Sequence, residues 1–112
     1  MIEYENMAEK SLFLLPDFAG ADGETADQIL ENLFSLSRSF IEEGKTHWIG
    51  MISDGKLAKF YVNNIESCQT ALYQMLRLPY DRKEGAADFY KRVLEKENIR
   101  VEMITALSGT GL

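Results

Sequence analysis

The stretch HWIGMISDGKLAKFYVN, residues 47–63, is the strongest local indicator of the fold. Asp54-Gly55 stands between two apolar runs, and this arrangement is typical of a two-residue hairpin turn in which both residues need positive φ. We therefore expect the residues on either side of the turn to pair as antiparallel strands. Counting outward from the turn places Trp48 opposite Tyr61 near the far end of the hairpin.

Both faces of this expected hairpin are largely apolar. Alternation along the strands places Ile49, Met51, Ala58, Phe60 and Val62 on one face, and Trp48, Gly50, Ile52, Leu57, Lys59 and Tyr61 on the other. We expect the first face to pack against helices and the second, which carries a lysine, to be open. An open aromatic and aliphatic patch indicates a partner, a second copy or a ligand. Cover by the N-terminal segment or the C-terminal tail is the alternative.

Strand and helix patterns flank the hairpin on both sides. Ser11 to Leu15 is a short apolar run stopped by Pro16, as expected of a strand buried on both faces. Apolar residues at helical spacing predict three helices: one opening at Thr25 and ending at Gly44, one from Asn63 to Pro79, and one from Ala86 to about Asn98 with Phe89 and Val93 on its apolar side. Alternation from Ile99 to about Ala106 predicts a last strand.

This order of elements suggests a fold. Helices separated by strands, with one central hairpin, indicate an α+β domain of the ferredoxin-like βαββαβ plan. We therefore expect a four-stranded, mostly antiparallel sheet with the helices packed on one face. Residues 1–112 are expected to form a single globular domain, in which residues 108–112 are a flexible tail.

Charge is divided unevenly along the chain. Residues 1–55 carry eleven acids against three bases, whereas residues 56–112 carry seven acids against nine bases. An acidic field repels nucleic acid and anionic membranes and attracts a basic protein surface. We therefore expect no direct nucleic-acid or membrane binding, and a basic protein partner for the acids around the first helix: Asp17, Asp22, Glu24 and Asp27.

The composition is that of a soluble globular protein. The 112 residues are 46% apolar and 27% charged. The only cysteine, Cys68, cannot form an internal disulfide, so the fold needs no oxidising compartment. No secretory signal is visible and the longest apolar runs are too short to span a bilayer. We expect a cytoplasmic protein.

Groups that carry chemistry are scarce. His47 is the only histidine, expected at the rim of a strand, and Cys68 lies on the apolar stripe of its helix, where a buried thiol is expected. One His and one Cys cannot build a four-ligand zinc site within one chain. The Gly- and Asp-rich loop at residues 17–27 offers oxygen ligands but lacks calcium-loop spacing. We expect no catalytic constellation, no metal and no cofactor.

These features favour a non-enzymatic function. We expect a small acidic protein-binding domain of the inhibitor, immunity or regulatory type, whose basic partner could be a protein that normally binds nucleic acid. The expected binding residues are Trp48, Ile52, Leu57, Lys59, Tyr61, Asp17, Asp22, Glu24 and Asp27. The alternative is a dimeric ferredoxin-like ligand binder or enzyme with a pocket near Trp48, Tyr61 and His47. A homodimer is expected in either case, and a head-to-tail structural assembly is a third option.

Overall fold

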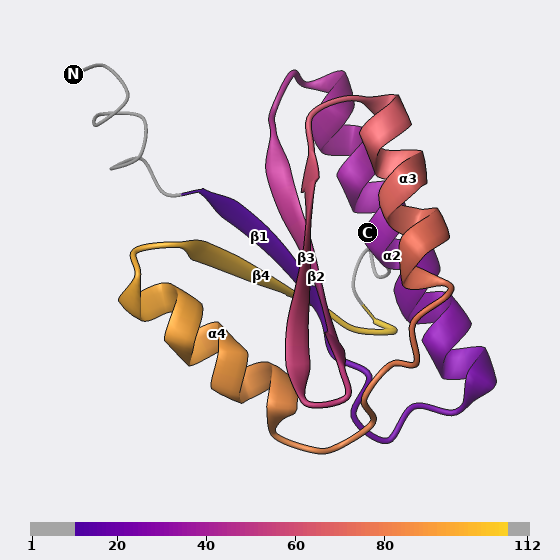
Figure 1. Ribbon diagram of the computed structural model, residues 1–112. Helices are drawn as coiled ribbons and strands as arrows, with labels where there is room; N and C mark the ends of the chain where they lie inside the picture. The colour runs from indigo at the N-terminus through magenta and orange to yellow at the C-terminus, as the bar shows by residue number, and fades with distance from the viewer. Residues whose placement is uncertain (1–10, 108–112) are drawn as a thin grey trace.

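The computed structural model describes residues 11–107 of the chain. Three helices and four strands follow one another in these residues (Figure 1): β1 (Leu12–Pro16), α2 (Gly23–Glu42), β2 (His47–Ser53), β3 (Lys56–Val62), α3 (Ile65–Met75), α4 (Ala86–Lys96) and β4 (Arg100–Ile104). Each corresponds to an element expected from the sequence. The expected tail at 108–112 lies outside the described residues.

The sheet differs from the expected one in its strand order. Its order is β3-β2-β1-β4, and β1 pairs in parallel with both β2 and β4. Only β3 runs antiparallel, as the second strand of the hairpin. The predicted ferredoxin-like, mostly antiparallel sheet is therefore wrong, and the sheet is mixed and mostly parallel.

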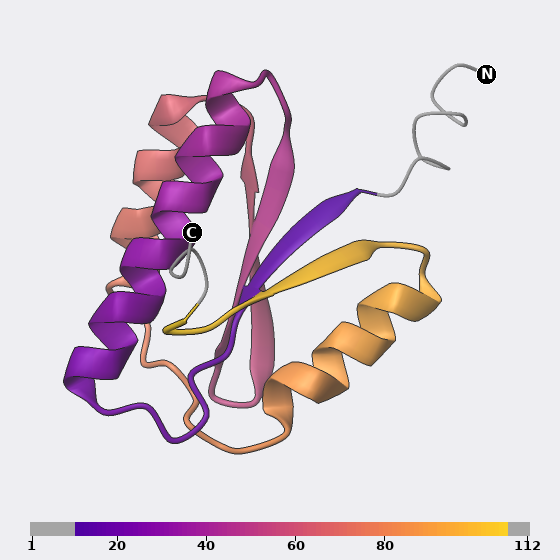
Figure 2. The same cartoon turned by 180° about the vertical axis from the view of Figure 1, so that it is seen from behind.

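The helices also do not gather on one face. Figure 2 shows the sheet between α2 and α3 on one side and α4 on the other. The physical reason lies in β1, which is apolar along its length and central in the sheet. Leu14 packs into the core under α2 and α3, whereas Phe13 and Leu15 pack into the core under α4. A strand that is apolar on both faces needs helices on both faces.

The hairpin is formed as predicted. Asp54 and Gly55 have φ values of 55° and 76°, the left-handed conformation that a two-residue turn with this twist requires. The register also agrees, because Trp48 lies opposite Tyr61 in the antiparallel ladder. The turn is held from outside by a hydrogen bond of 2.8 Å from the Tyr90 hydroxyl to the Gly55 carbonyl.

The starts of α2 and α3 are set by side-chain caps close to the predicted positions. α2 begins two residues before Thr25, because the carboxylate of Asp22 accepts the Thr25 N–H at 2.8 Å and so caps the helix. α3 is capped by Asn64 with Ser67 in a reciprocal capping box, one residue later than the sequence suggested. Gly44 follows the end of α2 with a φ of 75°.

Candidate functional site

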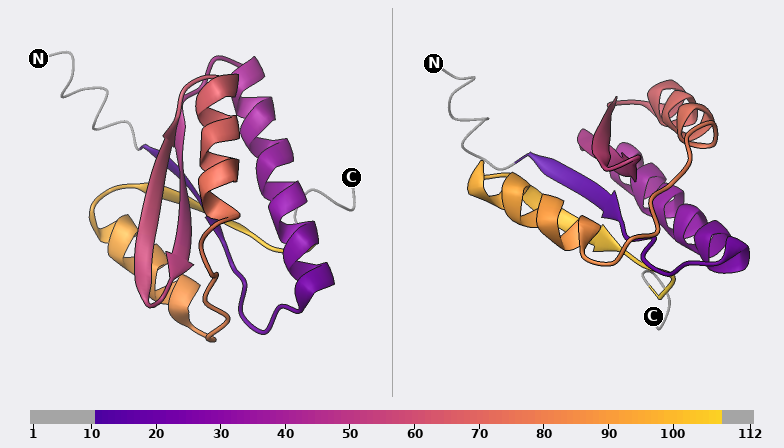
Figure 3. Two further views of the ribbon diagram at one scale, coloured as in Figure 1. Left: turned by 45° about the vertical axis from the view of Figure 1, so that its right-hand side comes forward. Right: turned by 60° about the horizontal axis from the view of Figure 1, so that its bottom comes forward.

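An aromatic surface around the exposed Tyr61 lies on the part of the sheet that α4 leaves open. α4 packs mainly against β4 and β1 and reaches the hairpin near its turn, at Ile52 and Gly55 (Figure 3). We call Trp48, Leu57, Lys59 and Tyr61 the hairpin surface. Tyr61 is 46% exposed, and its ring centroid lies 5.0 Å from that of the half-buried Trp48. A tilted aromatic pair beside a single cation is chemistry that suits a protein interface.

Two other residues expected on this surface do not contribute to it. Ile52 is only 4% exposed, because it lies in the core under α4, so its side chain is out of a partner's reach. Gly50 is buried, and a Cβ built on it would collide with the ring of Phe13. On this face of the hairpin, a partner can therefore reach only the hairpin surface as defined above.

One side of α4 extends the open surface with residues that the sequence assigned to a packed face. Phe89 is 55% exposed and Val93 is exposed as well. The neighbouring Tyr90 reaches the hairpin turn through its hydroxyl, and Val93 follows Tyr90 by three residues. Residues at this spacing lie on one side of a helix, so Val93 and Tyr90 both face the hairpin side. No local pattern predicts that Ala87 and Leu94 are the only fully buried residues of α4.

The acidic residues form a separate surface on α2. Glu24, Asp27, Glu31 and Glu42 are all exposed and follow one another at helical spacing. We call these four the acidic ridge. Within residues 11–107, none of them forms an ion pair. Because α2 and α4 lie on opposite faces of the sheet, the acidic ridge and the hairpin surface face different directions (Figure 3).

The two aspartates expected to accompany these acids have local structural partners. The Asp17 carboxylate accepts the N–H of Ala19 at 3.0 Å, as in an Asx turn. The Asp22 carboxylate caps α2, and the hydrogen bond from the Thr25 N–H lowers the pKa of Asp22 below its usual value. Both acids therefore stabilise the loop that leads from β1 into α2.

A buried polar cluster joins three residues that are distant in sequence. The Ser37 hydroxyl lies 2.6 Å from Nε2 of His47 and 3.5 Å from Sγ of Cys68. Their exposed fractions are 0%, 1% and 3% for Ser37, His47 and Cys68. Burial lowers the pKa of His47, which favours the neutral ring. The cluster resembles a nucleophile–base arrangement in composition, but the enclosing core keeps it from any substrate.

The position of His47 also bears on the pocket that the sequence suggested. His47 sits beneath Phe40 of α2, with ring centroids 5.5 Å apart. Trp48 and Tyr61 lie on the other face of the sheet, among the residues on the α4 side. The sheet thus separates the histidine from both aromatics, and the three do not line a common pocket.

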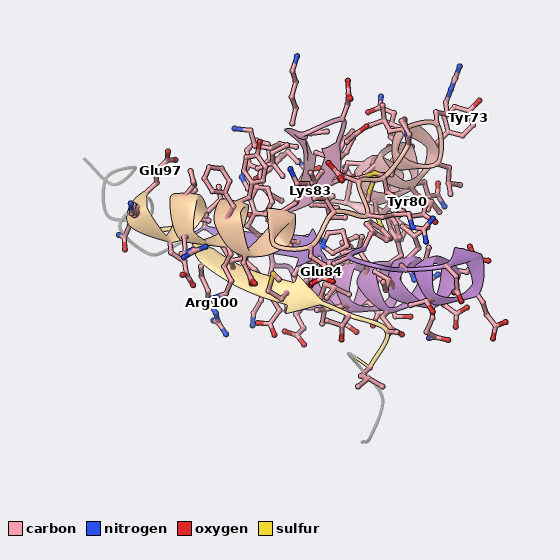
Figure 4. All side chains as sticks on the ribbon, turned by 90° about the horizontal axis from the view of Figure 1, so that it is seen from below. Tyr73, Tyr80, Lys83, Glu84, Glu97 and Arg100 are labelled. Carbon is pink, nitrogen blue, oxygen red and sulfur yellow. The ribbon has the colours of Figure 1, made fainter. Side chains whose placement is uncertain are left out.

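An apolar hollow lies between α2 and α3, away from His47, Trp48 and Tyr61. A cavity of about 330 Å³ lies where the end of α3 approaches the start of α2. Met51 and Met75 are buried in its floor, and Phe18 stacks on Tyr80 at a centroid distance of 4.6 Å. Figure 4 shows Tyr80 near this end of the molecule, with Lys83 and Glu84 following it toward α4.

The loop after α3 is tied to this end of the sheet by its own carboxylate. Asp81 accepts the N–H groups of Gly55 and Lys83 at 3.2 and 2.9 Å, and its own N–H donates to the Ile52 carbonyl at 2.9 Å. These bonds fix the hairpin turn to the α3–α4 connection. Asp81 therefore acts as a structural clamp.

Neither a metal centre nor a membrane helix is found in the described part of the chain. Within residues 11–107, no three histidine, cysteine or acidic side chains are grouped so that they could hold a metal ion. No helix in the same range has the length and apolar character that crossing a membrane requires.

Comparison with known proteins gives no relative for this chain. No family model matches it, and neither a curated protein nor a solved structure is significantly similar. The function must therefore be argued from the surfaces described above.

Proposed function

We propose that the chain is a small non-enzymatic protein-binding domain whose hairpin surface contacts the partner. One observation carries this proposal: α4 packs mainly on β1 and β4, and leaves Tyr61 exposed in ring contact with the half-buried Trp48. α4 exposes two further apolar side chains, Phe89 and Val93. Tryptophan and tyrosine are among the residues enriched in binding hot spots.

The acidic ridge supports a basic partner. Its four carboxylates are solvent-exposed, and Arg38 is the only base between Glu24 and Glu42. Such a ridge accelerates encounter with a positively charged protein and is screened by salt, since the Debye length is about 8 Å at physiological ionic strength. A domain of this kind acts as an inhibitor, an immunity factor or a regulator of a basic protein.

The test is partner capture with two sets of variants. Tyr61→Ser removes the exposed ring, and Glu24→Lys, Asp27→Lys and Glu31→Lys together reverse the charge of most of the acidic ridge. We expect Tyr61→Ser to weaken capture at every salt concentration, and the triple variant to weaken it mainly at low salt. Unchanged capture by both would refute the proposal, and Tyr73→Ser is the control because Tyr73 is an exposed tyrosine on α3.

A small-ligand binder is the second candidate, and the cavity between α2 and α3 favours it. Its volume of about 330 Å³ is at the lower end of the range for ligand pockets, and Asp27 and Arg82 supply polar groups at an apolar site. A thermal-shift screen of amphipathic small molecules tests it. Stabilisation that is lost in Met75→Trp, which fills the floor, would favour ligand binding.

Compartment and assembly complete the proposal. We propose a cytoplasmic location, supported by the unpaired and buried thiol of Cys68. A homodimer through the hairpin surface is the self-association that we expect, and light scattering at low and high salt tests it. A dimer that survives high salt and is lost in Trp48→Ala with Tyr61→Ala would place this surface at the dimer interface.

A further inference from the structure

The sheet ends at β3, and the outer edge of this strand carries unpaired backbone groups. In the antiparallel ladder, residues alternate between pairs that are hydrogen-bonded to the partner strand and pairs that are not. The two-residue turn makes Ser53–Lys56 a bonded pair, so Leu57, Lys59 and Tyr61 point their N–H and C=O groups away from β2. The Ile52 carbonyl is consistent with this alternation. Ile52 lies opposite Leu57, and its carbonyl points away from β3 and accepts the Asp81 N–H.

Among residues 11–107, no strand pairs with these outward groups. β3 is the terminal strand of the sheet, and no backbone hydrogen bond to Leu57, Lys59 or Tyr61 from another element is found within residues 11–107. In Figure 1, β3 lies in front of the other strands and no helix crosses its outer side. A row of three N–H and three C=O groups is complementary to one kind of ligand only, an extended polypeptide.

A groove runs beside this edge and would take the side chains of such a ligand. It lies between β3 and α3, has a volume of about 360 Å³, and is lined on the helix side by Ser67, Thr70, Ala71 and Gln74. An added strand would direct alternate side chains into this groove and onto the hairpin surface, because strand side chains alternate between faces. The groove is polar on its helix side, whereas the hairpin surface is aromatic and aliphatic.

The charge on the edge selects the occupant. In antiparallel pairing of two copies centred on β3, Lys59 would lie directly opposite the Lys59 of the other copy, and like charges in this position are destabilising. An acidic residue opposite Lys59 would instead gain a cross-strand ion pair. Leu57 and Tyr61, two residues away on either side, favour apolar partners.

We propose that β3 accepts an extended segment of a partner protein as a fifth strand, with a carboxylate opposite Lys59 and apolar side chains opposite Leu57 and Tyr61. This inference rests on the proposed function and names the mode of binding at the same surface. Main-chain hydrogen bonds supply the affinity, and the alternation of apolar, acidic and apolar residues supplies the specificity.

The probe is the synthetic peptide Thr-Leu-Thr-Glu-Thr-Leu-Thr, which reads the same in both directions and so favours neither strand orientation. The readout is backbone amide hydrogen exchange, residue by residue. At about 90% occupancy we expect exchange at Leu57, Lys59 and Tyr61 to slow about tenfold, because only the free fraction exchanges. Ala58 and Phe60, already bonded to β2, should not change.

Lys59→Pro is the decisive variant. Proline at this position removes an outward N–H and no hydrogen bond of the hairpin, so the domain keeps its fold while the edge is blocked. We expect this variant to lose the alternating protection. Lys59→Glu should weaken binding up to about fivefold, the upper range of one cross-strand charge pair, and a peptide with Lys in place of Glu should restore it.

Three results would overturn the inference: no binding of the peptide, protection without the alternation, or full binding by Lys59→Pro. The proposed function fails separately. If a captured partner is lost in Tyr61→Ser but retained in Lys59→Pro, the hairpin surface binds through its side chains and the added strand is refuted. If both variants retain it, both proposals are refuted.

Discussion

Gly50 gives the most direct check on the packing that shapes the hairpin surface. It lies under the ring of Phe13, and a Cβ at this position would collide with that ring and lie 3.1 Å from Cδ1 of Leu57. Phe13 is itself enclosed in the core under α4, so its ring has little room to give way. We expect Gly50→Ala to lower the free energy of unfolding by about 1–3 kcal/mol, the usual cost of overpacking.

Urea unfolding followed by tryptophan fluorescence measures this change, with Gly23→Ala as the matched control. Gly23 opens α2, has no neighbouring atom within 4 Å of an added Cβ and does not require positive φ. Alanine there should raise the free energy of unfolding by about 0.4–1 kcal/mol, because it restricts the unfolded chain. If Gly50→Ala proves as stable as the control, the close packing of Phe13 on Gly50 is refuted.

Three further predictions concern the core, the surface and a helix cap. Burial lowers the pKa of His47 from its usual 6.5, so the free energy of unfolding should be highest above pH 6.5 and fall by at most about 1.4 kcal/mol per pH unit below it. The urea midpoints measured at pH 5 and pH 7 should therefore differ in the wild type and converge in His47→Gln. If His47→Gln shows the same pH dependence as the wild type, the prediction is contradicted. Tyr61→Ser should weaken partner binding at least about tenfold while changing stability by less than about 1 kcal/mol, measured by titration calorimetry and urea unfolding. Asp22→Ala should lower the urea midpoint relative to the wild type at neutral pH. This difference in midpoint should shrink below pH 3.8, as the wild-type carboxylate becomes protonated. A difference that persists in acid would refute the role of Asp22 as a helix cap.

Local chemistry made the elements predictable. The Asp54-Gly55 turn depends on two residues with positive φ, and the pairing of Trp48 with Tyr61 follows by counting from it. Helix stripes and caps are equally local, which is why the starts of the three helices were predicted to within two residues. The end of α3, which was expected at Pro79, lies at Met75 instead. The alternation along β2 also predicts that His47 is buried, since it lies on the same face of the strand as Ile49 and Met51.

The arrangement of these elements depends on contacts that no local pattern records. The same order of strands and helices is compatible with two topologies, and the difference is whether β1 pairs with β2 and which face α4 takes. The apolar character of β1 on both faces was the available clue. That α4 would leave Phe89 and Val93 exposed, and Ile52 covered, follows only from where the helix lies over the sheet.

The central claim, that the hairpin surface binds a protein, is tested most directly by site-specific photo-crosslinking. A benzophenone amino acid at position 61 is compared with the same group at position 73, which is an exposed tyrosine on α3 away from the hairpin surface. Irradiation in the source cell extract should give a discrete adduct with one partner protein from position 61 and none from position 73. No adduct at position 61, or the same adducts at both positions, would contradict the claim.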